Sequence, residues 1–489
     1  MEVNSPPYTL VFFGATGDLF QSKLLPALFL LHKTSLLHPD TLVFGCGRTN
    51  MDDAAFHDFI ETTLPRGIAK QDKDIFLSRF SYCRVDPAYK ESFIALREKL
   101  DAVDYSIPRS RLYYLAVPPT ANESLIANLS ESGLMEEEDH SQNGFRHILL
   151  EKPFGTDLDS AGDMDTFLLK HADEHQYFRI DHYLGKDTVQ NIMIMRFANL
   201  IFEPIWDSQY IDHIQISVSE KGGIGGRAGY YDKAGAVRDM FQNHLLEILA
   251  LIAMEKPATF DAESIRRVKL QLFNAIRPFS EEEIGINPVR GQYAGYKNEA
   301  GVAPDSRAET FAALRLWIDN PRWKGVPFYL RSGKCLSETV STVTISFKSL
   351  SNSFFENEPP NKLTLRIQPN EGMCLNLRAK HPGPKFCIGD LPLAFCYSDL
   401  GDTSSAPNGY ARLLLDAMLH DHTLFVHRET IAASWRFFTP ILKIWENDPD
   451  AYHLHQYEQG SQGPAASDEL MAHDGRAWEQ IKLDIPIGR

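Results

Sequence analysis

The chain has 489 residues, of which 43% are hydrophobic and 23% are charged. These values are typical of globular proteins and exclude a disordered chain, and the length predicts two to four domains at roughly 100–200 residues each. The 49 Lys and Arg residues against 65 Asp and Glu residues give a net charge of −16. A chain this acidic is not expected to bind nucleic acid or an anionic membrane surface, although a local basic cluster can still hold a small anion.

The six cysteines are scattered, with no CxxC pair and no spacing typical of a zinc site. We therefore expect free thiols, a cytoplasmic location and no metal ion. The first eight residues carry no basic stretch, and the longest apolar run, Leu245–Met254, is too short to span a bilayer. We expect neither a signal peptide nor a membrane anchor.

Short apolar runs alternate with helical patterns in the first third of the chain. The predicted strands are 8–14, 41–47, 80–85, 111–117 and 147–151, and the predicted helices between and after them are 21–32, 89–103, 121–132 and 158–171. This alternation predicts βαβ units on a parallel sheet that is buried on both faces. It indicates an α/β domain over residues 1–178.

The pattern changes after about residue 178. The predicted strands are then 211–219, 269–272, 311–318, 328–331, 340–347, 362–368, 374–380 and 391–397, and the predicted helices are 236–255, 410–419 and 428–442. Many strands with few helices between them predict a larger α+β domain over residues 179–489, with a big, mostly antiparallel sheet. Residues 448–489 are more polar and are expected to be irregular, with Trp478 and Ile485 available to anchor them.

A turn that contains two glycines follows the first predicted strand. The segment reads Gly14-Ala15-Thr16-Gly17-Asp18-Leu19 and leads into a predicted helix. Gly14 and Gly17 match the second and third glycines of the G-x-G-x-x-G fingerprint, while Phe12 stands at the first position. A helix N-terminus after such a turn binds pyrophosphate through its N–H groups. The turn favours a dinucleotide site, with a strand-to-helix turn without a ligand as the alternative.

The end of the second predicted strand bears on the choice of cofactor. An acidic residue at this place binds the ribose of NAD, whereas an Arg accommodates the 2′-phosphate of NADP. This chain has Arg48 and Thr49 there and no carboxylate before Asp52. Lys23, early in the first helix, would add positive charge. We therefore predict NADP, with NAD as a weaker alternative and an ordinary solvated Arg48 as the other interpretation.

Two polar segments lie near the end of the predicted parallel sheet. Lys152 follows the fifth strand, where ligands of open α/β sheets bind, although a lysine at this place is often only solvated. His182, Tyr183 and Lys186, in the sequence RIDHYLGK, offer several donors to one anion such as a phosphate. If this segment is helical, His182 and Lys186 share a face. The alternative is a polar helix start capped by Asp181.

A histidine with polar neighbours lies at the edge of an apolar helical stripe. His244 is near Asp239, Gln242 and Asn243 in a predicted helix that is otherwise very apolar. A partly buried imidazole held by a carboxylate can act as a general base near neutral pH. The alternative is a core histidine without a catalytic role.

Three further candidates lie at the ends of predicted strands in the second domain. Lys334, in the sequence RSGK, offers a cation, and Glu220 and Gln368 offer polar groups. Each is weak alone, and a solvated turn is the alternative for Lys334.

Taken together, these segments resemble the glucose-6-phosphate dehydrogenase family. The resemblance rests on motifs along nearly the whole chain: GATGDL at 14–19, YYLAVPPT at 113–120, EKPFG at 151–155, RIDHYLGK at 179–186, FANLIFEPIW at 197–206, GRAGYYDKAGAVRDMFQNHLLE at 226–247, RSGK at 331–334 and RIQPNE at 366–371.

The resemblance implies a Rossmann-like NADP-binding domain and a β+α domain that binds substrate and dimerises through its sheet. It also implies NADP-dependent oxidation of glucose 6-phosphate at C1 to the 6-phosphogluconolactone, which is the first step of the oxidative pentose phosphate pathway. A homodimer or tetramer is expected.

The motifs also imply roles for single residues. His244 matches the general base, and Asp181 matches the carboxylate that orients it. The positions that match substrate contacts are Lys152, His182, Tyr183, Lys186, Glu220, Asp239, Lys334 and Gln368. The positions that match cofactor contacts are Gly14, Thr16, Gly17, Asp18, Lys23, Arg48 and, again, Lys152.

The sequence departs from the family pattern at two places. Many members carry a basic residue five positions after the RSGK lysine, where this chain has Thr339, so one sugar contact is in doubt. The cofactor helix commonly opens with basic residues, but Phe20-Gln21-Ser22 precede Lys23 here. We expect this change to weaken the grip on the 2′-phosphate and to admit some NAD.

Two other functions fit parts of the sequence. One is a related NAD(P) oxidoreductase that acts on a sugar without a phosphate or on an aldehyde. The other is an inactive NADP-binding sensor, but the presence of Asp181, His244 and Lys186 argues against it.

Overall fold

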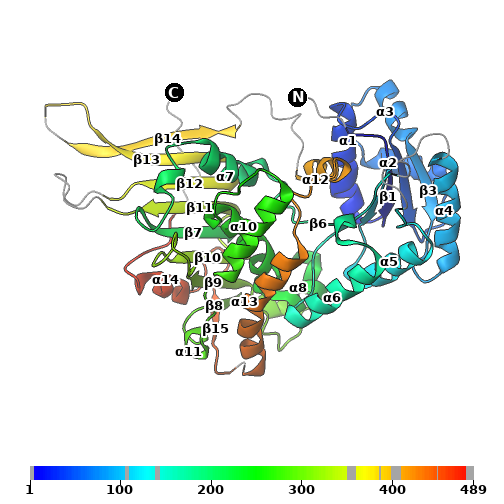
Figure 1. Ribbon diagram of the computed structural model, residues 1–489. Helices are drawn as coiled ribbons and strands as arrows, with labels where there is room; N and C mark the ends of the chain where they lie inside the picture. Colours follow the sequence, from blue (N-terminus) through cyan, green and yellow to red (C-terminus); the bar gives the residue numbers. More distant parts are fainter. Residues whose placement is uncertain are drawn as a thin grey trace.

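The computed structural model describes residues 5–65, 67–104, 110–137, 144–349, 359–384, 387–397, 409–448 and 450–480. The chain forms two sheets, each with its own helices (Figure 1). The N-terminal part is coloured blue to cyan, and the large C-terminal sheet runs from green to yellow except for β15, which is orange-red. Among the helices in these ranges, none is long and apolar enough to cross a membrane.

The N-terminal sheet has six parallel strands in the described ranges, in the order β3-β2-β1-β4-β5-β6. They are β1 (Tyr8–Phe13), β2 (Leu42–Gly47), β3 (Phe80–Arg84), β4 (Ser110–Leu115), β5 (Arg146–Leu150) and β6 (Tyr177–Arg179). Every residue of β1 and β5 is buried, as expected of strands with helices on both faces. The strand order reverses between β1 and β4, so a crevice forms at their carboxyl ends. The predicted Rossmann-like domain is confirmed.

Helices and short helical turns connect these strands. They are η1 (Phe20–Leu24), α1 (Leu25–Lys33), α2 (Asp53–Thr63), α3 (Lys70–Leu77), α4 (Lys90–Asp104), η2 (Pro119–Ala121), α5 (Asn122–Glu131), α6 (Leu158–His171) and η3 (Glu174–Gln176). Aspartates cap two of them: Asp52 accepts from the backbone of Ala55, and Asp157 accepts from that of Ser160.

The second sheet has nine strands in the described ranges, in the order β14-β13-β12-β11-β7-β10-β9-β8-β15. They are β7 (Ile211–Ser219), β8 (Val289–Tyr293), β9 (Phe311–Leu316), β10 (Phe328–Gly333), β11 (Val340–Phe347), β12 (Lys362–Gln368), β13 (Gly372–Lys380), β14 (Ile388–Cys396) and β15 (Leu454–Tyr457). Two neighbouring pairs, β7–β10 and β8–β15, are parallel, and the others are antiparallel. The predicted large, mostly antiparallel sheet is confirmed.

The helices of the second part include the one that carries His244. They are α7 (Asp187–Ala198), η4 (Glu203–Ile205), η5 (Gly225–Arg227), α8 (Ala228–Ala236), η6 (Val237–Leu245), α9 (Leu246–Ala253), α10 (Ala262–Asn274), α11 (Glu281–Ile284), η7 (Tyr296–Asn298), α12 (Gly409–Met418), α13 (Arg428–Asn447) and α14 (Ala465–Ala472). The helix predicted over 236–255 is formed by η6 and α9. A wider π-type winding in η6 is of the kind that often occurs at functional sites.

The two parts of the chain are packed against each other. Helix α12 contacts α1, and α13 contacts both α6 and η6 (Figure 1). One buried hydrophobic cluster runs through both parts. Because β6 leads directly into residues 180–186 and then into α7, these residues connect the first sheet to the second.

Two predictions about elements are wrong. Residues 269–272 belong to α10 and not to a strand, because the Asp261 side chain caps the helix and Ile265, Leu272 and Phe273 are buried at helical spacing. A short alternating run does not distinguish the two periods. The tail is not wholly irregular, since it forms β15, which pairs with β8, and α14. Trp478 is buried beneath Arg331, whereas Ile485 lies outside the described residues.

Candidate active site

Strand ends of the second sheet bring Glu220 and Lys334 together. Strands β7 and β10 are parallel neighbours with Ser219 opposite Gly333, so the residue after each strand emerges at the same edge. The ammonium of Lys334 donates to the carboxylate of Glu220. Lys334 is almost fully buried, and its Nζ also lies 5.0 Å from the centre of the Tyr231 ring. The edge therefore presents a fixed cation next to a carboxylate.

The end of β12 brings Gln368 to the same region. Gln368 lies opposite Ser341 near the start of β11, at an irregularity in the pairing of the two strands. The ammonium of Lys186 donates to the side-chain oxygen of Gln368. The Tyr183 hydroxyl lies 3.5 Å from Oγ of Ser341. The RIDHYLGK segment is thus attached to the sheet through two of its side chains.

The RIDHYLGK segment itself is a turn and not a helix, so the helical pairing of His182 with Lys186 does not occur. Oδ1 of Asp181 accepts the backbone N–H of Tyr183 at 2.9 Å. A side chain that bonds its own backbone two residues on competes with helix formation. Helix α7 begins only after Lys186.

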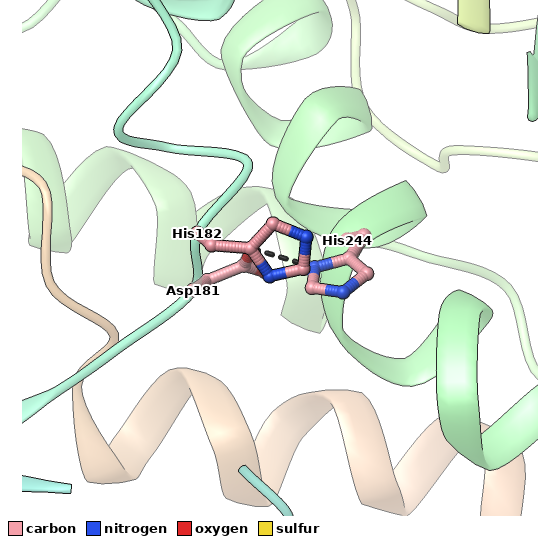
Figure 2. Close-up of side chains that lie close together, drawn as sticks. All are labelled: Asp181, His182 and His244. Atoms are coloured by element: carbon pink, nitrogen blue, oxygen red, sulfur yellow. Dashed lines mark hydrogen bonds and ion pairs between the residues drawn. The ribbon is translucent and has the colours of Figure 1, made fainter. Parts of the chain in front are cut away.

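His244 and Asp181 form a buried dyad (Figure 2). Nδ1 of His244 lies 2.6 Å from Oδ1 of Asp181, and the two side chains are 1% and 2% exposed. Since a carboxylate only accepts, Nδ1 carries the proton and Nε2 is left as the acceptor. The imidazole is therefore held in the tautomer that a general base needs.

Lys152 and Asp239 lie on the other side of the imidazole. Nζ of Lys152 is 3.0 Å from Nε2 of His244, and it also donates to Asp239 at Oδ1 (3.1 Å) and at the backbone oxygen (2.7 Å). Burial opposes the charge of Asp239, but Lys152 and Lys334 hold the pKa of this carboxyl below its ordinary value. Asp239 is thus the partner of the lysine and not of His244.

Burial dominates the electrostatics of the dyad. Burial, and after it the charge of Lys152, lowers the pKa of His244 well below its ordinary value. The imidazole is therefore the free base at neutral pH. Burial raises the pKa of Asp181, while His182, the backbone of Tyr183 and Lys152 act in the opposite direction.

The Tyr183 ring separates the base from a second cation. It stacks on the His244 ring at a centroid distance of 4.5 Å, and Nζ of Lys186 lies 4.5 Å from the centre of the same ring. His182 packs edge-on against His244, also at 4.5 Å (Figure 2). Burial lowers the pKa of Lys186, against the charge of Glu371. The site therefore holds a neutral base and a cation about one aromatic ring apart.

A cavity of about 560 Å³ lies at the carboxyl ends of β1, β2, β3 and β4. Gly14, Thr16, Gly17 and Arg48 line it, together with residues of the turns after β3 and β4. Gly14 has a φ of +84°, and a Cβ there would lie 2.2 Å from the carbonyl oxygen of Ala116. The turn thus exposes bare backbone at the helix start, which fits a pyrophosphate.

The other predicted cofactor residues lie nearby but not in this cavity. Asp18 and Lys23 are exposed on the turn and on η1, and Lys152 lies beyond the next strand, beside His244. Phe20, at the place of the family's basic run, is fully buried and packs edge-on against Phe12. One position of the family's basic run is therefore occupied in this chain by a buried phenylalanine of the hydrophobic core.

Thr339, the other departure, has a backbone role. Its hydroxyl accepts the N–H of Lys221 at 2.9 Å, next to Glu220. It contributes no charge to the site.

Asp181, His182 and His244 each place one potential metal ligand within 4.8 Å of the others. The Nε2 atom of His244 faces the ammonium of Lys152, however, and a cation so close would repel a metal ion. Nδ1 is engaged by Asp181. These contacts fit a proton-transfer dyad better than a metal site.

Several residues of the site were not predicted. The hydroxyl of Tyr230 lies 3.4 Å from Asp239, and the ring of Tyr410 is parallel to that of His182. Ser341, near the start of β11, lies beside the Tyr183 hydroxyl. Such contacts come from elements distant in the chain, and no local motif marks them.

Comparison with known proteins finds matches along nearly the whole chain. Residues 11–191 match the family model "Glucose-6-phosphate dehydrogenase, NAD binding domain", and residues 193–479 match "Glucose-6-phosphate dehydrogenase, C-terminal domain". The glucose-6-phosphate 1-dehydrogenase of Aggregatibacter actinomycetemcomitans is 40% identical over 96% of this chain and 97% of its own length. That of Bacillus subtilis is 38% identical over 98% of this chain and 100% of its own length.

A solved structure described as glucose-6-phosphate dehydrogenase in complex with its substrate glucose-6-phosphate has a TM-score of 0.91 to this chain. It is 32% identical and covers 98% of this chain and 100% of its own. The fold and the site thus define an oxidoreductase that joins a Rossmann-like nucleotide-binding domain to a second α+β domain. The chain belongs to the glucose-6-phosphate dehydrogenase family. The resemblance drawn from the sequence motifs is confirmed.

Proposed function

We propose that the protein oxidises D-glucose 6-phosphate at C1 to 6-phospho-D-glucono-1,5-lactone with NADP, the first step of the oxidative pentose phosphate pathway. The observation that carries this proposal is the His244–Asp181 dyad, separated by the Tyr183 ring from the Lys186 cation. This arrangement offers a base to one end of a sugar and a cation to the phosphate at the other end.

His244 is the proposed general base. Nε2 takes the proton of the C1 hydroxyl, and Asp181 stabilises the imidazolium that results. Bound NADP supplies the acceptor, at nicotinamide C4, for the hydride that leaves C1. The burial that lowers the pKa of His244 also makes Asp181 necessary, because an imidazolium without a counter-charge is costly in such a site.

Lys152 has two proposed roles. Before substrate binds, its ammonium donates to the same Nε2 atom that must accept the proton. The C1 hydroxyl has to take its place, and Asp239 offers the displaced ammonium another partner. From there, Lys152 can contact the sugar and the nicotinamide end of the cofactor.

The remaining polar residues hold the substrate. We assign the phosphate to His182, Tyr183 and Lys186, because charge-assisted hydrogen bonds bind a dianion most strongly. We assign the sugar hydroxyls to Glu220, Asp239, Lys334 and Gln368. Binding energy gained at the phosphate then aligns C1 with the base.

The cofactor assignment rests on the cavity along β1, β2 and β4. Gly14 and Gly17 shape a turn that suits a pyrophosphate, with Thr16 and Asp18 beside it. Arg48, at the end of β2, would face a 2′-phosphate, and Lys23 is close in sequence to the same turn. We expect NADP to be preferred and NAD to be a weaker substrate.

The proposal extends to assembly and location. We expect a homodimer or tetramer formed through the nine-stranded sheet, with a boundary between the two domains near residue 178. We expect a cytoplasmic protein, in keeping with six cysteines that are all free thiols. We expect no nucleic acid, membrane or metal ion as a partner.

The test is the variant His244→Asn in a steady-state assay with glucose 6-phosphate and NADP. We expect kcat to fall by about 10²- to 10⁴-fold, the usual contribution of a general base, while KM for the sugar phosphate stays near that of the wild type. His473→Asn, a change at an exposed histidine, is the matched control. A kcat close to that of the wild type would exclude His244 as the base.

A further inference from the structure

A buried ion pair joins α10 to α9, the helix that continues η6 beyond His244. Nζ of Lys269, on α10, is 2.5 Å from Oε2 of Glu247, the second residue of α9. The two side chains are 6% and 4% exposed. Glu247 is the one charged residue of a helix that otherwise consists of Leu, Ile and Ala.

Stability alone does not account for this pair. Transferring two charges into the interior is costly, and apolar residues of similar size often serve a protein at least as well. The other residues of α9 are all apolar, so an apolar side chain in place of Glu247 would match the rest of the helix. The position of the charges therefore needs another explanation.

The pair is placed to act electrostatically on Asp181, the partner of His244. Glu247 follows His244 by three residues on the continuous helix of η6 and α9, so both face the same side. The charge of Lys269 acts on the pKa of Asp181, and the charge of Asp181 acts on that of Glu247. Oδ2 of Asp181 is buried with no hydrogen-bond partner among the described residues. Its charge is thus balanced by nearby cations.

We propose that Lys269 and Glu247 form a positioning ion pair, which balances the charge around Asp181 and so sets the pH range in which His244 accepts a proton. This inference rests on the proposed role of His244. Both residues are positioning residues, since neither touches the reacting atoms.

Other charged and titratable groups also face the dyad and stay constant in the test. They come from the end of β5, the RIDHYLGK turn, η6 and α12, and they are Glu151, Lys152, His182, Tyr183, Lys186, Asp239 and Tyr410. Lys269 also borders a cavity of about 340 Å³, where it is joined by Glu174, His175, Glu263, Arg266, His422 and His427.

The experiment compares the pH dependence of kcat/KM for four proteins: the wild type, Lys269→Met, Glu247→Gln and the double variant. The acid limb of this profile reports the base of the free enzyme. Lys269→Met leaves a negative charge, which favours the imidazolium, so the limb moves to higher pH. Glu247→Gln leaves a positive charge, so the limb moves to lower pH. We expect shifts of about 0.5–1 pH unit, and a limb close to that of the wild type in the double variant.

The proposal is tested by the directions in which the acid limb moves in the two single variants. Titration of the substrate phosphate is common to all four profiles and cancels. A merely structural pair would lower the height of each profile without moving the limb in opposite directions, and that result would overturn the proposal. Lys269→Met could fail to fold because it buries a carboxylate without a partner. In that case Glu247→Gln should still move the acid limb to lower pH, and the double variant should return it to the wild-type position.

The outcome is distinct from failure of the proposed function. If His244→Asn keeps full activity, His244 is not the base, and the proposed effect of the ion pair on it is wrong as well. If His244→Asn is inactive and the four limbs coincide, only the positioning role is wrong. Lys269→Arg, which keeps the charge, should leave the limb unchanged.

Discussion

Asp181 contacts both the local turn and His244 with one oxygen. Oδ1 accepts from the backbone of Tyr183 and from the ring of His244. The turn holds the carboxylate in place for its contact with the imidazole of His244, which lies 63 residues further along the chain. The alternative of a helix start capped by Asp181 is wrong, because α7 begins only after Lys186.

Lys186 is the cation to which we assign the phosphate. Lys186→Ala should raise KM for glucose 6-phosphate by about 10- to 100-fold, because a charge-assisted hydrogen bond contributes roughly 1.5–3 kcal/mol. Activity with free glucose should change little, because that substrate has no phosphate. Steady-state kinetics with both sugars measure this.

Lys170→Ala, at an exposed position of α6, is the matched control and should leave both KM values unchanged. An equal loss with glucose and with its phosphate would contradict the role of Lys186 as a phosphate ligand.

Part of the site could be predicted from single residues. Lys152, Glu220, Lys334 and Gln368 lie at strand ends, and the topology gathers those ends. The partner of His244 could not be found from local spacing. Asp239 is nearest in the helix but pairs with Lys152, and only the family resemblance pointed to Asp181.

The turn between β1 and η1 depends on the absence of one side chain. Gly14 has a φ of +84°, and its backbone N–H donates to the carbonyl of Cys46 on β2. A Cβ would meet the carbonyl oxygen of Ala116 at 2.2 Å. That oxygen belongs to the backbone at the end of β4 and cannot rotate away. The shape of the cavity beside this turn therefore depends on three adjacent strands.

Gly14→Ala should deform this turn. We expect KM for NADP to rise at least about tenfold and the melting temperature to fall, because the left-handed backbone alone costs an Ala roughly 1–2 kcal/mol. KM for glucose 6-phosphate should change much less. Kinetics and thermal unfolding measure the two effects.

Gly325→Ala is the control that separates the effect of backbone strain from the effect of a Cβ clash. Gly325 has the same φ of +84°, but a Cβ there would meet nothing within 4 Å. It should lose a similar amount of stability and keep a normal KM for NADP. If Gly14→Ala also keeps a normal KM, the turn does not bind the cofactor.

Long patterns predicted elements well, and short ones did not. Most strands of both sheets and the helices that form η6–α9 and α13 follow from apolar runs and spacing, but β8 was not predicted. The three-residue β6 and the run Lys269–Leu272, which proved helical, carry too few residues for a period to be read. Strand β15 was missed because its neighbours are polar and its pairing with β8 is distant.

Across the molecule, the turn after β6 connects the two sheets and their polar strand ends. The first sheet carries the cavity to which we assign the cofactor and, after β5, Lys152, and the second carries Glu220, Lys334 and Gln368. The net charge of −16 does not prevent anion binding, because Lys152, Lys186 and Lys334 gather in this one place.

The most direct test is steady-state reduction of the nicotinamide by the wild-type protein. It would compare glucose 6-phosphate with free glucose, and NADP with NAD, by absorbance. We expect strong turnover with glucose 6-phosphate and NADP, weaker turnover with NAD, and a kcat/KM for free glucose lower by several orders of magnitude. Equal activity with free glucose, or no turnover with either cofactor, would contradict the proposed function.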